Sequence, residues 1–188
     1  MPTPWLKRIK ETGQLTVFNK ATAWTDSIHA AMTTFNGLSM GVKLVNEQQE
    51  KSANIVIILA NGPQQYKYYG DIADSGSDFT ADSLSGETSA LIDKRMKAIF
   101  FAAIFLPGKI PKATKDQKQV VVVHEFIHAS GMPGEHEDVG IMFPQMKESG
   151  SGLIEYLPDQ DAKPMPPIRL GPQTRCKIQM VWSGASCP

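Results

Sequence analysis

The sequence has no excess charge of either sign, few cysteines, and no apolar run long enough to span a membrane. Its 188 residues include 19 basic and 19 acidic ones, so the formal net charge is zero. A neutral chain gives no electrostatic reason to expect binding to nucleic acid or to an anionic membrane. The apolar run from Ala98 to Leu106 is too short for a bilayer span and is typical of a buried strand.

The remaining composition is that of one globular domain. Hydrophobic residues make up 41% and charged residues 20% of the chain, both ordinary values for a globular protein. The length suffices for one hydrophobic core, so we expect a single domain over residues 1–188. No hydrophobic region follows Lys7 and Arg8, so we expect no signal peptide in this chain.

The two cysteines, Cys176 and Cys187, both lie near the C-terminus. They can close a small disulfide loop in an oxidising compartment or remain thiols in a reducing one. Their surroundings supply no further zinc ligands. The sequence leaves both alternatives open.

The chemistry of the chain is concentrated in the motif H-E-x-x-H, which runs from His124 to His128. On a helix the two histidines lie one turn apart on one face, and both imidazoles can reach the same metal ion. Glu125 then lies beside them and can act on a metal-bound water without binding the metal. The spacing therefore predicts the centre of a zinc hydrolase.

Two secondary structures compete for this segment. The run from Val120 to Val123 is β-branched and favours a strand. A helix is favoured by Thr114 and Gln117, which fit a capping box, and by Gly131, which fits a left-handed C-cap. We expect a helix over about residues 115–130.

The motif continues as H-E-x-x-H-x-x-G through Gly131, and Ile141-Met142-Phe143-Pro144 follows. In these residues the chain resembles the metzincin zinc metallopeptidases, especially the matrixin-like branch, in which a methionine turn lies beneath the metal. The resemblance implies an α+β, zincin-like fold with a twisted mixed sheet, an active-site helix, a Met-turn and a C-terminal helix. It also implies an N-terminal subdomain over about residues 1–131 and a C-terminal one over about 132–188. Met142 would be the hydrophobic floor of the site.

The third metal ligand departs from the family pattern. The family's third histidine falls three residues after the glycine, where this chain has Gly134, and His136 follows two residues later. We predict that His136 is the third ligand, because Gly134 can let the loop bulge. Glu148 remains open, since it follows His128 by twenty residues, a spacing that thermolysin-like enzymes use. The other carboxylates that remain open are Glu135, Glu137 and Asp138.

The resemblance implies a zinc-dependent endopeptidase with one catalytic Zn²⁺ and a protein or peptide substrate. Zinc lowers the pKa of its bound water to about 7, and Glu125 would act as the general base toward an amide. The polar stretch contains four aspartates, Asp71, Asp74, Asp78 and Asp82. They could bind Ca²⁺, but we expect a solvated loop instead. Two alternatives are an endoribonuclease-like metal hydrolase and an inactive zincin-fold binding module.

The other elements follow from apolar periodicity. We predict strands over 14–18, 42–46, 54–59 and 98–106, a helix from Trp24 to Gly37, and a short helix from near Pro172. Residues 61–87, the segment 146–152 and the proline-rich segment 144–167 are predicted as loops. A signal-less, neutral zincin fits a monomeric bacterial toxin or effector, secreted or delivered rather than resident in the cytoplasm. Such a protein would have a cognate inhibitor or immunity protein.

Overall fold

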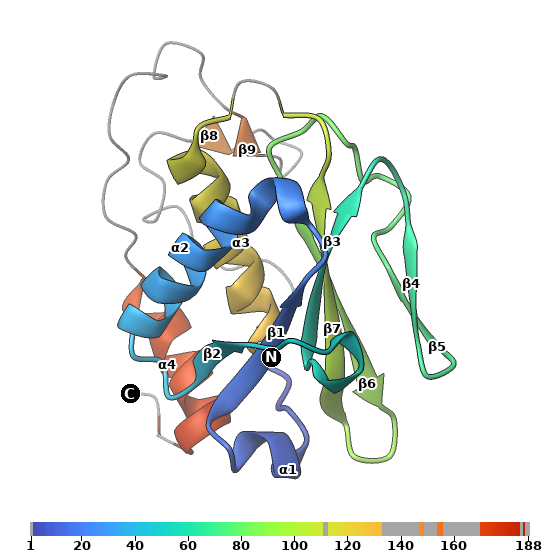
Figure 1. Cartoon of the computed structure of the whole chain (residues 1–188). Helices are drawn as coiled ribbons and strands as arrows, with labels where there is room; N and C mark the ends of the chain where they lie inside the picture. Colours follow the sequence, from blue (N-terminus) through green and yellow to red (C-terminus); the bar gives the residue numbers. More distant parts are fainter. Residues whose placement is uncertain are drawn as a thin grey trace.

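The computed structural model describes residues 2–110, 113–132, 147–148, 154–155, 170–184 and 186. It is an α+β protein in which helices cover one face of a five-stranded mixed sheet and a hairpin covers the other (Figure 1). The elements are α1 (Lys7–Lys10), β1 (Gln14–Asn19), η1 (Thr22–Trp24), α2 (Thr25–Gly37), β2 (Lys43–Asn46), η2 (Glu50–Ser52), β3 (Ile55–Ala60), β4 (Gln65–Tyr68), β5 (Asp71–Asp74), β6 (Glu87–Asp93), β7 (Ala98–Pro107), α3 (Lys115–Ala129), β8 (Lys147–Glu148), β9 (Ile154–Glu155) and α4 (Pro172–Ser183).

The main sheet has the strand order β2-β1-β3-β7-β6. Its first four strands are parallel, and β6 alone runs antiparallel, paired with β7. β3 lies in the middle with Ile55 to Ile58 buried, as its continuous apolar run predicts. The four predicted strands correspond to β1, β2, β3 and β7, and all four are confirmed.

Helices α2 and α3 lie side by side on one face of the sheet (Figure 1). The rings of Phe35 and Phe126 meet edge to face with 5.9 Å between their centroids. The Gln119 side-chain amide donates to the Thr34 hydroxyl at 2.7 Å. The core between these helices and the sheet therefore fixes the position of α3, on which the H-E-x-x-H motif lies.

Local signals set the ends of α3. The Thr114 hydroxyl oxygen accepts from the Gln117 N–H at 3.3 Å, and the Gln117 side chain accepts from the Thr114 N–H at 2.7 Å. Gly131 follows the helix with φ +116°. Residues 120–123 are buried within the helix, so the cap and tertiary burial outweigh their β-branched preference. The predicted helix is confirmed, and the strand alternative is wrong.

The predicted loop over residues 61–87 is wrong at residues 65–68 and 71–74, which form the hairpin β4–β5, and at Glu87, which begins β6; residues 61–64 and 75–86 are non-regular as predicted. The rings of Tyr66 and Tyr68 on β4 stack over Phe101, with centroid separations of 5.5 and 3.9 Å. The hairpin turns through Tyr69 and Gly70, which have φ values of +47° and +98°. Positive φ at both positions is the type I′ geometry that matches strand twist. β6 was also not among the predicted strands.

The C-terminal helix is confirmed as α4, with Thr174, Ile178, Val181 and Trp182 buried. Cys176 is disulfide-bonded, and Cys187 lies outside the described residues. The predicted loop over 146–152 is wrong at Lys147 and Glu148, which form β8 and pair with β9. Most of the proline-rich segment 144–167 lies outside the described residues. No helix within the described ranges is long and apolar enough to cross a bilayer.

Candidate metal centre

The two histidines of the motif point their outer ring nitrogens toward each other. His124 and His128 lie one turn apart on α3, and their Nε2 atoms are 2.9 Å apart. Their rings are nearly perpendicular, at 85°, with 4.5 Å between centroids. Both side chains are partly exposed. Two convergent imidazoles at the surface of a buried helix can bind a metal ion that arrives from solvent.

The orientation of His128 is fixed by a backbone carbonyl. Its Nδ1 lies 2.8 Å from the carbonyl oxygen of Met132. A carbonyl only accepts, so Nδ1 carries the proton, and in the neutral ring the lone pair is on Nε2. A hydrogen bond from the second nitrogen to a carbonyl is the usual support of a metal-binding histidine.

The histidine pair fits a tetrahedral zinc ion after a small adjustment. Zn–N bonds of about 2.0–2.1 Å at a tetrahedral angle place two nitrogens about 3.3 Å apart. The observed Nε2 separation is 2.9 Å, so the rings need to open by only a few tenths of an ångström. Among the described residues, no group of three or more His, Cys, Asp or Glu side chains is placed to bind a metal. The histidine pair could thus supply two of the ligands that a zinc site needs.

The predicted third ligand His136 and the predicted floor Met142 lie outside the described residues. So do the alternative ligands Glu135, Glu137 and Asp138. Glu148 belongs to β8, but its side chain is also outside the description. The choice among these ligands stays a prediction.

Glu125 points between α3 and the edge strand β6. Its side chain is 2% exposed. The Thr88 hydroxyl on β6 lies 2.6 Å from Oε2 of Glu125 and 3.2 Å from its backbone carbonyl oxygen. A carboxylate can accept this short bond, so β6 provides the hydrogen bond that holds the buried carboxyl group.

Gly86, just before β6, leaves the space that the Glu125 side chain occupies. A Cβ at position 86 would lie 2.6 Å from Cγ of Glu125 and 2.9 Å from both Cδ and Oε1. Such distances are far inside ordinary van der Waals contact. The motif did not predict either Gly86 or Thr88 as part of the site. Gly86 and Thr88 could have been found from the sequence if β6 had been predicted as the strand next to the motif helix.

The site shifts the pKa values of two carboxyl groups upward. Burial raises the pKa of Glu125, while His128 and the Thr88 hydrogen bond oppose this shift. Burial also raises the pKa of Glu87 to about 7, with further contributions from Glu125, Asp74 and Asp78. Neighbouring carboxyl groups thus make deprotonation harder at this end of β6.

Two indole groups bind carbonyls at the C-terminal end of α3. Trp5 Nε1–H donates to the Ala129 carbonyl and Trp182 Nε1–H to the Ser130 carbonyl, each at 2.8 Å. Carbonyls in the last turn of a helix have no partner within the helix. The N-terminal segment and α4 therefore both stabilise the turn that follows His128.

Comparisons with known proteins give no family for this chain. A scan against protein-family models found no match, and a search of curated proteins found none either. The function is therefore inferred from the residues of the site and their geometry.

Proposed function

We propose that this chain is a zinc-dependent endopeptidase of the metzincin type. The observation that carries the proposal is the arrangement on α3, where the Nε2 atoms of His124 and His128 lie 2.9 Å apart and the buried Glu125 is their neighbour in sequence. This combination offers two imidazole nitrogens as metal ligands and one carboxylate, that of Glu125, which faces β6 and is not one of the ligands. It is the donor set that hydrolytic zinc sites use.

His124 and His128 would hold the ion, with His136 as the proposed third ligand. When bound, zinc supplies a Lewis acid that activates water near neutral pH and polarises a carbonyl group. His128 is already oriented for this role by the Met132 carbonyl. Ligand nitrogens fixed in this way lose less freedom when a metal binds.

Glu125 would be the general base. It would take a proton from the attacking water and return it to the leaving amine as the amide bond breaks. The Thr88 hydroxyl holds its carboxylate at 2.6 Å, and Gly86 leaves room for it. Both contacts restrict the base to the side of α3 that faces β6.

The edge strand supports a peptide as the substrate class. β6 is the terminal strand of the sheet, and it carries Thr88. An extended peptide can add to such an edge through backbone hydrogen bonds. Substrate bound along β6 would lie on the strand that contacts Glu125. The mixed sheet, the motif helix α3 and the C-terminal helix α4 also agree with what the metzincin resemblance implies.

The proposal is tested by measuring zinc content and cleavage of a denatured protein mixture. The wild-type chain should hold about one zinc ion and cut the mixture. Glu125→Ala should keep the zinc and lose cleavage by about a hundred- to ten-thousandfold. His124→Ala should lose both, and Glu11→Ala, at an exposed carboxylate on the surface, should lose neither.

Two outcomes would replace this function with another. Cleavage of RNA that persists in Glu125→Ala but not in His124→Ala would indicate an endoribonuclease-like metal hydrolase. A chain that holds zinc but cuts neither protein nor RNA would indicate a binding module with a structural ion. Delivery as a bacterial toxin or effector, with a cognate inhibitor or immunity protein, stays a prediction.

A further inference from the structure

A hollow lies on the hairpin side of the sheet, between η2 and β4. Its volume is about 480 Å³. The hairpin packs on the core that contains Phe101, whereas α3 packs on the opposite face of the sheet. We call this hollow the β4 groove. It is lined by Gln49, Glu50, Lys51, Tyr66, Lys67, Tyr68 and Tyr69.

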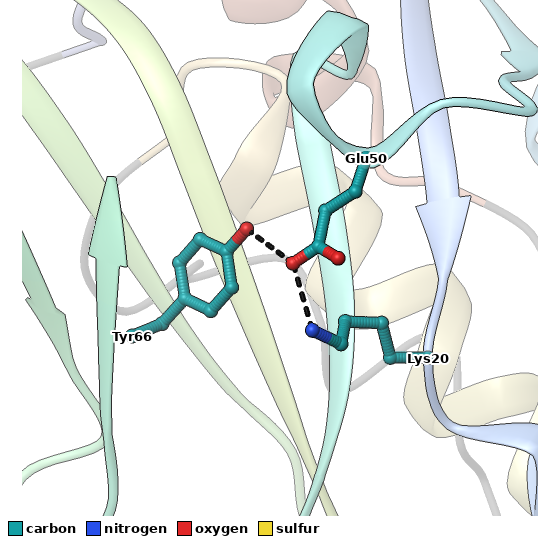
Figure 2. Close-up of polar contacts among 3 residues, drawn as sticks. All are labelled: Lys20, Glu50 and Tyr66. Carbon is teal, nitrogen blue, oxygen red and sulfur yellow. Dashed lines mark hydrogen bonds and ion pairs between the residues drawn. The ribbon is translucent and has the colours of Figure 1, made fainter. Parts of the chain in front are cut away.

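Two of the lining residues, Glu50 and Tyr66, form a polar cluster with Lys20 (Figure 2). Oε1 of Glu50 accepts from both Lys20 Nζ and the Tyr66 hydroxyl, each at 2.7 Å. The hydrogen bonds from Lys20 and Tyr66 lower the pKa of Glu50, so its carboxylate is ionised and offsets the charge of Lys20. Lys20 directly follows β1, Glu50 belongs to η2 and Tyr66 to β4, so the cluster ties these parts of the chain together.

Three tyrosines, Tyr66, Tyr68 and Tyr69, are among the residues that line the groove. Tyr68 stacks on Phe101 with 3.9 Å between ring centroids and 14° between the planes. Tyr69, at the hairpin tip, is 76% exposed and has φ +47°. An exposed aromatic residue in the left-handed region is costly for folding alone and points to a role in contact with a partner. Tyrosine also gives large contact area with little loss of side-chain freedom.

The backbone of β4 has one edge without a partner strand. In the described part of the chain, β4 pairs only with β5. The closing hydrogen bond of the type I′ turn joins Tyr68 and Asp71. Along the β4–β5 ladder, hydrogen-bonded residue pairs then alternate with pairs that are not hydrogen-bonded. The peptide groups of Lys67 and Gln65 therefore point away from β5. They can pair with one further strand.

Apart from Glu50, which forms an ion pair with Lys20, the charged side chains that line the groove are positive. Lys51 and Lys67 are exposed among the lining residues, whereas the charges of Lys20 and Glu50 offset each other. A peptide with acidic side chains complements this rim, and its apolar side chains can contact the tyrosine rings. We propose that the β4 groove binds an extended acidic peptide segment of a partner protein as an added strand beside β4. This inference does not rest on the proposed peptidase function.

The test uses the full chain with Glu125→Gln in every arm, so that no probe is cut. The probe is a peptide of about six residues, the usual length of a strand, with alternating Glu and Val. Its affinity is compared by fluorescence anisotropy with that of a Lys–Val peptide, an acidic peptide whose alternate amides are N-methylated, and an oligothymidylate. We expect saturable binding of the acidic peptide and at least about tenfold weaker binding of the other three.

Variants at position 67 separate backbone pairing from charge. Lys67→Pro removes an outward N–H and should weaken binding about tenfold, whereas Lys67→Gln removes only the charge and should weaken it about threefold. Lys43→Gln on β2 removes a charge elsewhere and should change nothing. The proposal is overturned if the acidic peptide does not bind, if N-methylation has no effect, or if the oligothymidylate binds equally well. Because the N-methylated peptide needs no variant, the test does not depend on the folding of Lys67→Pro.

Discussion

Gly86 is the position at which one added methyl group tests the geometry of Glu125, the proposed general base. In Gly86→Ala the new Cβ would lie 2.6 Å from Cγ of Glu125. Ordinary carbon contacts are about 3.5 Å or longer, so one of the two groups must move by about 1 Å. Glu125 is 2% exposed, so it cannot move aside into solvent. We expect this overpacking to lower the free energy of unfolding by about 1–3 kcal/mol.

The same displacement should impair catalysis and leave metal binding unchanged. A shift of about 1 Å in a catalytic group can lower the rate about a hundredfold. The nearest atoms to the new Cβ all belong to Glu125, so we expect the two histidines that are the proposed metal ligands to keep their positions. We therefore expect kcat/KM for a peptide substrate to fall about a hundredfold, with the zinc content of the wild type.

A double-mutant cycle assigns the cost to this contact. Glu125→Ala removes the Cγ that the new methyl group meets, so Gly86→Ala should destabilise that background much less than the wild type. Gly37→Ala is the matched control, because a Cβ at position 37 meets no atom within 4 Å. Urea unfolding measures all four chains and the control. An equal cost of Gly86→Ala in both backgrounds, or full activity of the single variant, would refute the reasoning.

Three further predictions concern neighbouring contacts. Thr88→Val should lower the free energy of unfolding, measured in urea, by about 2 kcal/mol, because Glu125 loses the hydrogen bond from the Thr88 hydroxyl. Thr88→Ser keeps a hydroxyl and should restore the stability, so equal values for the two variants would contradict the prediction. The pKa of Glu87 is raised from 4.5 to about 7, so the folded state favours its neutral form and loses stability as pH rises between these values. With metal chelated, Glu87→Gln should therefore add about 1 kcal/mol at about pH 8, after allowance for solvent screening, and nothing at about pH 4. Trp182→Phe leaves the Ser130 carbonyl without its donor and should cost about 1–3 kcal/mol in thermal unfolding, whereas a neutral result would mean that this bond adds no stability.

Local sequence signals predicted the part of the site that lies on one helix. The capping box of Thr114 and Gln117 sets the start of α3 through bonds between residues three apart. The two histidines then lie on one face because positions four apart differ by only about 40° around a helix. Neither fact needs knowledge of the rest of the fold.

Contacts between distant segments explain what the sequence analysis missed. Thr88 meets Glu125 across 37 positions, and Trp5 meets Ala129 across 124. β6 gave no strand signal, because its side chains are neither fully buried nor clearly alternating. The hairpin β4–β5 was missed because its turn uses Tyr69 where asparagine or glycine is usual.

The division of the site between helix and sheet has a consequence for how the motif works. Glu125 follows His124 by about 100° around the helix, so it faces β6 when the histidine rings face outward. The carboxylate therefore depends on the Thr88 hydroxyl at 2.6 Å and on the space at Gly86, which the motif does not include. The same H-E-x-x-H sequence beside a bulkier strand would keep its metal ligands and lose its base. Under the proposed function, the edge strand thus determines whether the proposed metal site can also be a hydrolytic one.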